Sequence, residues 1–116
     1  MLAPARMPIS AESLRGTWSG TWDHTNRACT IEIDSVRGNA FSGTLRQNEA
    51  VVRFEGTFDS NTRMLYFNET KVISIGAYGE WSLGTNSGFI SPDGRTLVGS
   101  GHDKWGWYGW QVKADF

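Results

Sequence analysis

Apolar and polar residues alternate with a period of two along most of this chain, from Arg15 onward. Such alternation predicts strands with one buried face, and the short, turn-rich intervals between them predict antiparallel neighbours. The helical signal amounts to one capped turn over residues 10–14. The pattern yields eight strands, at residues 15–23, 28–35, 40–47, 50–58, 63–70, about 79–91, 95–101 and 107–114.

A five-residue repeat, aromatic-x-Gly-Thr-apolar, occurs at 18–22, 41–45 and 54–58. Positions one, three and five of a strand share a face, so each copy places a glycine between two large apolar groups. Inward glycines let strands bend around a closed barrel, and closure removes exposed sheet edges. We therefore predict one all-β domain, an eight-stranded antiparallel up-and-down β-barrel over residues 15–116, preceded by a short N-terminal arm, residues 1–14. A β-sandwich is the alternative.

The same alternation predicts which side chains face inward. Their bulk would fill much of the lumen, so a packed core and a ligand cavity are both compatible with the sequence. The predicted inward side chains are Trp18, Trp22, Ile31, Ile33, Phe41, Leu45, Phe54, Phe58, Leu65, Phe67, Trp81, Leu83, Leu97, Trp110 and Val112.

Composition narrows the class of protein. The 116 residues carry a net charge of −1, which gives no electrostatic warrant for binding nucleic acid or an anionic membrane. The opening segment lacks the apolar core of a signal peptide and Cys29 is the single cysteine, so we expect a cytoplasmic protein. Cys29 shares a face with the isoleucines that follow it, which predicts a buried, inert thiol.

In an up-and-down barrel the connections after odd-numbered strands meet at one rim. Both histidines fall in these connections, His24 beside Asp23 and His102 beside Asp103, and the two loops should be near each other because closure makes strands one and eight adjacent. A general acid–base pair, a metal site and solvated loop residues are the three interpretations, and no specific catalytic or metal motif decides between them. The connections at this rim, the predicted mouth, are residues 23–27, 47–49, 71–78 and 102–106.

Aromatic residues are concentrated in the last hairpin, where 105–110 contains four large rings. Tyr108 and Trp110 share one face of the predicted strand, whereas Trp107 points the other way. Inward rings would form an apolar wall for a ligand, and an outward tryptophan beside a glycine suggests an oligomer interface. The candidate ligand-binding residues are Trp22, Tyr78, Trp81, Trp105, Trp107, Tyr108 and Trp110.

Segments 16–18, 41–45 and 54–59 resemble the strand pattern of the avidin and streptavidin barrels. The run 88–99 is also similar to small bacterial β-barrel domains, some of them appended to caspase-like proteases. The resemblance implies a calycin-like barrel.

Biotin binding does not follow from this resemblance. Gly20 stands where the avidins carry a polar residue that bonds the ureido group, and the loop after the third strand is shortened to 47–49. Asp115 is the doubtful counterpart of the aspartate that closes the biotin site.

We expect a noncatalytic barrel that binds a small apolar or amphipathic ligand, or a partner, at its aromatic mouth. One alternative is a small barrel enzyme of the cyclase or isomerase type, with His24 or His102 supplying proton transfer. Another is an oligomerisation domain with a filled core. The expected partners are a small molecule and further copies of the chain, without nucleic acid, membrane, cofactor or metal.

Overall fold

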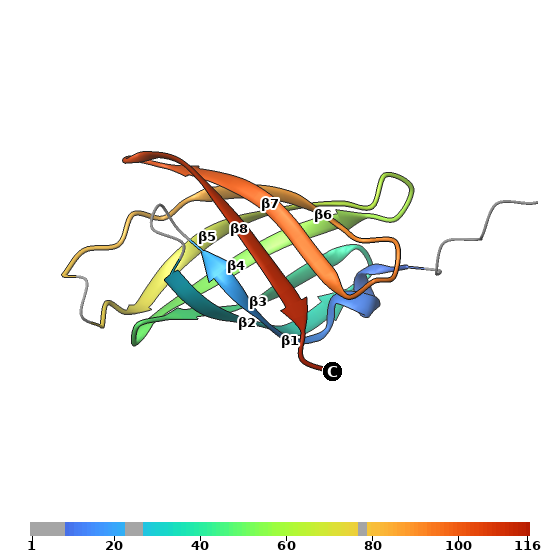
Figure 1. Ribbon diagram of the computed structural model, residues 1–116, viewed down its shortest axis with the longest axis horizontal. Coiled ribbons are helices and arrows are strands. Elements are labelled where there is room, and N and C mark those ends of the chain that lie inside the picture. Colours follow the sequence, from blue (N-terminus) through green and yellow to red (C-terminus); the bar gives the residue numbers. More distant parts are fainter. Residues whose placement is uncertain (1–8, 23–26, 77–78) are drawn as a thin grey trace, which may run out of the picture.

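A closed barrel of eight antiparallel strands forms the fold, each strand pairing with the next and the last with the first (Figure 1). The structure, a computed structural model, describes residues 9–22, 27–76 and 79–116. The predicted all-β, up-and-down barrel is therefore confirmed, and the sandwich alternative is wrong. The strands are β1 Gly16–Trp22, β2 Arg27–Arg37, β3 Ala40–Gln47, β4 Ala50–Asp59, β5 Met64–Ser74, β6 Thr85–Ile90, β7 Thr96–Asp103 and β8 Gly106–Ala114, with a 3-10 turn η1 at Ala11–Leu14.

The sixth strand is shorter than its pattern predicts. It begins at Thr85, because residues 79–84 form a connection without a strand partner, so period-two alternation does not govern their side chains. Two predicted inward residues lie in this connection and are corrections: Leu83 is 45% exposed, and Trp81 is half-buried against the edge of the core. The other predicted inward side chains are buried.

Two glycines of the five-residue repeat, Gly43 and Gly56, make room for rings. A Cβ added at Gly43 would lie 2.8 Å from Phe54 Cζ, and one at Gly56 would lie 2.8 Å from Phe41 Cζ. The rings of Phe41 and Phe54 in turn meet edge to face, with centroids 6.3 Å apart. Each glycine therefore accommodates a ring from a neighbouring strand, which explains why the motif recurs on β3 and β4.

One end of the lumen is filled by the segment that precedes β1. Ala11 and Leu14 of η1 are fully buried in the core, and Trp18 Nε1 donates to the Leu14 carbonyl at 2.9 Å. Figure 1 shows η1 at the end of the barrel where β2 turns into β3. The opposite end, where β5 finishes and β6 begins, is the mouth. No helix among the described residues is long and apolar enough to cross a membrane.

Candidate functional site

Buried polar side chains gather at the mouth end of the lumen. Each continues the inward face of its strand: Gln47 ends β3, Asn86 and Tyr108 lie near the starts of β6 and β8, and Glu69 lies in the middle of β5. All four are buried. Deeper inward positions on these strands are apolar residues or glycine. The barrel therefore has an apolar interior with a polar layer at the mouth.

The carboxylate of Glu69 is the centre of this layer. It is 6% exposed and accepts hydrogen bonds from three uncharged donors. Trp81 Nε1 donates to Oε1 at 2.7 Å, Asn86 Nδ2 donates to Oε2 at 3.0 Å, and the Tyr108 hydroxyl lies 3.1 Å from Oε2. Burying a carboxylate is costly unless it is paired or hydrogen-bonded, and here neutral donors supply the compensation. The ion pairs shown by the structure lie elsewhere, at Arg15–Glu12, Arg53–Asp34 and Lys104–Glu80.

Tyr108 links the carboxylate to Asn86. Its hydroxyl lies 2.7 Å from Asn86 Oδ1 as well as beside Glu69, so two acceptors share one hydroxyl hydrogen. Burial raises the pKa of the Tyr108 phenol far above its ordinary value, and the neighbouring Glu69 raises it further. Tyr108 therefore remains protonated and acts as a donor at neutral pH.

Two glycines leave the space that this network occupies. A Cβ at Gly101 would lie 2.5 Å from Tyr108 Cζ and would also collide with Asn86 Oδ1. A Cβ at Gly84 would lie within contact distance of the Tyr108 hydroxyl, and the Gly84 carbonyl accepts from the Glu69 backbone N–H at 2.9 Å. The connection before β6 thus passes close over Glu69 because residue 84 has no side chain.

Aromatic rings form the wall and floor beneath the polar layer. Trp22, fully buried, stacks on Trp110 with centroids 5.2 Å apart and an interplanar angle of 17°. Its ring also lies 5.9 Å from that of Tyr108 and 6.0 Å from that of Phe67. These contacts fill the lumen below the mouth with side chains, so a ligand would have to occupy the mouth itself.

Gln47 brings an unsatisfied acceptor to the same layer. Its Nε2 donates to the carbonyls of Trp22 at 3.1 Å and Arg27 at 3.3 Å. Within the part of the chain that the structure describes, nothing donates to its buried Oε1. A buried acceptor without a donor is costly, and such atoms commonly receive a bound water or ligand.

The candidate ligand-binding residues divide into two groups. Trp22, Tyr108 and Trp110 face the lumen, and Trp81 reaches Glu69 from the connection before β6. Trp105 and Trp107 are 55% and 73% exposed, and Trp107 projects from the outer wall of β8. Tyr78 lies outside the described residues.

The two histidines were candidates for proton transfer. His102 lies on the outer face of β7, with its ring 5.0 Å from that of Trp107, and so does not face the Glu69 network. Asp103 accepts from the Trp105 backbone N–H at 2.8 Å. His24 and its neighbour Asp23 lie outside the described residues. In the described ranges no group of three or more His, Cys, Asp or Glu side chains could hold a metal ion.

Sequence reasoning missed Gln47, Glu69 and Asn86, although the signal was present. Glu69 follows Leu65 and Phe67 at intervals of two, which places it on the inward face. Gln47 follows Leu45 in the same way. A charged or amide side chain in phase with core residues is the observation that would have found this layer.

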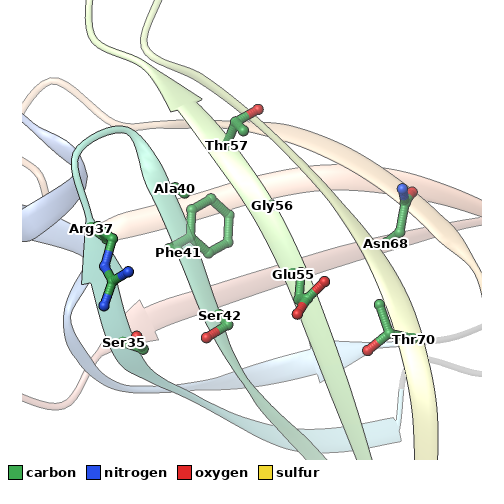
Figure 2. A pocket seen from close by; sticks show the side chains of 10 residues that line it. All are labelled: Ser35, Arg37, Ala40, Phe41, Ser42, Glu55, Gly56, Thr57, Asn68 and Thr70. Atoms are coloured by element: carbon green, nitrogen blue, oxygen red, sulfur yellow. The ribbon is translucent and has the colours of Figure 1, made fainter.

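The outer wall carries hollows that are separate from the mouth. Figure 2 shows one of about 460 Å³ over β2 to β5, with Phe41 and Gly56 among its lining. Hydroxyl and amide groups dominate its rim, along with Arg37 and Glu55. It contains no cysteine, histidine or carboxylate pair that would support catalysis.

Comparison with protein-family models, with curated proteins and with solved structures finds no match for this chain. The barrel agrees with a calycin-like or avidin-like fold at the level of strand number, direction and closure.

Proposed function

We propose that this barrel is a noncatalytic binding module, which takes a small amphipathic ligand at the mouth end of its lumen. The observation that carries the proposal is the buried Glu69 carboxylate, whose partners are uncharged. A protonated amine or amidine would supply the missing positive charge. Its apolar part would lie against the rings at the mouth, where a cation is also attracted to the face of an aromatic ring.

The second acceptor strengthens this proposal. Gln47 Oε1 is a second buried acceptor at the mouth end of β3 and is without a donor among the described residues. A buried carboxylate and a buried amide oxygen both call for N–H donors, which favours an amidinium or a substituted ammonium over a purely apolar molecule. The noncatalytic proposal fits the described residues better than proton transfer by His102, because His102 lies on the outer wall.

The first test is a native mass spectrum of freshly purified protein, with a denatured spectrum as its control. The proposal expects a reproducible excess over 12.9 kDa that is lost on denaturation, and the excess gives the mass of the ligand.

Thermal unfolding with tryptamine, phenethylamine and benzamidine tests the chemistry directly. A ligand present at about 100 times its Kd stabilises by about 2.7 kcal/mol, a shift of about 11 °C for a domain of this size. Glu69→Gln should abolish the shift measured from that variant's own midpoint. Glu32→Gln is the matched control, because Glu32 is exposed on β2, and it should retain the shift. A bare native mass together with no shift from any of the three amines would contradict the proposal.

A further inference from the structure

The central part of the outer face of β5 to β8, called the charge-free face below, carries no charged side chain, and the exposed Lys71 of β5 and Lys113 of β8 lie beyond it along their strands. The strand register aligns twelve outward positions in three rows of four, one from each strand. None of the twelve is Lys, Arg, Asp or Glu. The rows are Met64–Phe89–Val98–Gln111, Tyr66–Ser87–Ser100–Gly109 and Asn68–Thr85–His102–Trp107.

This composition differs from that of the rest of the outer wall. Charged residues make up 20% of the chain, and about 25–35% of a typical soluble surface, so three or four would be expected among twelve exposed positions. The strands on the other side of the barrel do carry them, and Arg53 of β4 pairs with Asp34 of β2 there at 3.0 Å. The outward charged residues of β2, β3 and β4 are Glu32, Asp34, Arg37, Arg46, Arg53, Glu55 and Asp59.

Large rings stand on the charge-free face at its margins. Tyr66 is 51% exposed, Phe89 49% and Trp107 73%. The centre of the face is low, because Ser87, Ser100 and Gly109 occupy it. A hollow of about 460 Å³ lies over this region, with Tyr66, Ser100 and Trp107 in its lining and Glu55 of β4 at its edge. A face with both protruding rings and a hollow can be complementary in shape to a second copy of itself.

We propose that the outer face of β5–β8 is the interface of a homodimer, with a second copy of this chain as its partner. In this dimer the two faces stack, and a twofold axis runs between them, parallel to the strands and above the line between β6 and β7. The axis places β5 of one copy over β8 of the other. The register then places Tyr66 opposite Gly109 and Phe89 opposite Val98. Tyr66 and Phe89 thus meet a small or apolar position of the other copy, Trp107 meets Asn68, and none of the twelve paired positions carries a formal charge.

The footprint sets the expected strength. Outward residues are spaced about 4.8 Å between strands and about 6.7 Å along them, so each covers about 32 Å² and twelve cover about 390 Å² of flat sheet. The sides of the protruding rings add to this area. Two such faces reach about 1,000 Å² of buried surface, the lower end of specific interfaces, where weak, reversible association is typical.

Gly109 offers a way to break the dimer without disturbing the barrel. It lies at the β8 end of the middle row, opposite Tyr66 of the other copy, and the nearest atom to a Cβ added there is 3.8 Å away. Gly109→Arg would place a long charged side chain in the interface, where it would be desolvated without a partner. Ala28→Arg is the matched control, because Ala28 is exposed on the outer wall of β2.

Sedimentation equilibrium from about 1 to about 300 µM is the experiment, with circular dichroism to confirm that each variant folds. The apparent mass of the wild-type protein should rise from 12.9 kDa toward twice that value as its concentration increases. Gly109→Arg should weaken the association at least tenfold, whereas Ala28→Arg should leave it unchanged. Trp107→Ala should also weaken it. A wild-type chain that stays monomeric at all these concentrations would overturn the proposal. This holds also if the face turns out to bind an oligosaccharide. A dimer that Gly109→Arg leaves intact would overturn it as well.

Discussion

Tyr108→Phe removes one oxygen atom from the centre of the mouth layer. The ring remains, and with it the packing against Trp22 at 5.9 Å. The lost hydroxyl leaves Asn86 Oδ1, 2.7 Å away, without this donor and removes one of three donors from the buried Glu69 carboxylate. Leaving a buried acceptor unpaired costs about 1–3 kcal/mol, and hydrogen bonds to charged groups lie at the upper end, so we expect a loss of about 2 kcal/mol.

The corresponding fall in melting temperature follows from chain length. An unfolding entropy of about 2.1 cal/mol/K per residue gives about 0.24 kcal/mol/K for this chain, or about 4 °C per kcal/mol. Tyr108→Phe should therefore lower the midpoint by about 8 °C. Tyr66→Phe is the matched control, since that side chain is 51% exposed on the outer wall, and it should change stability by less than about 0.5 kcal/mol.

Urea unfolding followed by tryptophan fluorescence measures both variants at one temperature. A double-mutant cycle with Asn86→Ala isolates the pair, for which we expect a coupling of at least about 0.5 kcal/mol. A Tyr108→Phe variant as stable as Tyr66→Phe would refute the inference that the buried hydroxyl is needed to satisfy Asn86 and Glu69.

Three further predictions concern the barrel as a whole. Gly20→Ala should lower the free energy of unfolding by about 3 kcal/mol or more, because the added Cβ would lie 2.7 Å from Val112 Cα and collide with the backbone of β8. Gly109→Ala should change it by less than about 0.5 kcal/mol, and urea unfolding at low protein concentration measures both. Burial raises the pKa of the Cys29 thiol from 9.0 to about 12. Iodoacetamide at pH 8 should therefore label the native protein at least about a hundredfold more slowly than the urea-unfolded chain. Equal labelling rates would contradict this prediction. Cys29 and Tyr108 both have pKa values that are higher in the folded protein than in the unfolded chain. Their contribution to stability is therefore complete below the unfolded-chain pKa values and is lost as the pH rises above about 9. Urea midpoints should therefore fall between pH 8.5 and 10.5, and a constant midpoint would contradict it.

The fold could be predicted because its determinants are local. Period-two alternation and short turns specify antiparallel neighbours, and the glycines at 43 and 56 are explained by the rings of Phe41 and Phe54 that occupy their space. The largest boundary error, before β6, lies where this logic stops. The segment containing Trp81 alternates like a strand, yet it has no strand partner, and its indole donates to Glu69, twelve residues earlier in the chain.

The candidate site was harder to predict because its members become neighbours only when the barrel closes. Glu69, Asn86 and Tyr108 come from three strands, and the pair Glu69–Tyr108 is separated by 39 residues. Sequence alone predicted which rings of the last hairpin face inward, and Tyr108 and Trp110 are buried as predicted, since the alternation along one strand is a local property. It also directed attention to histidines at the predicted mouth, and His102 then proved to belong to the outer wall.

One alternation explains both surfaces of the last hairpin. Tyr108 and Trp110 point inward and complete the lumen, whereas Trp107 and Gly109 between them form part of the outer face. The predicted division of this aromatic cluster into inward and outward rings is confirmed by their burial. Because the two sets are interleaved on β8, a substitution at an outward position can alter association while the inward network stays in place. The ligand proposal and the dimer proposal can therefore fail independently of each other.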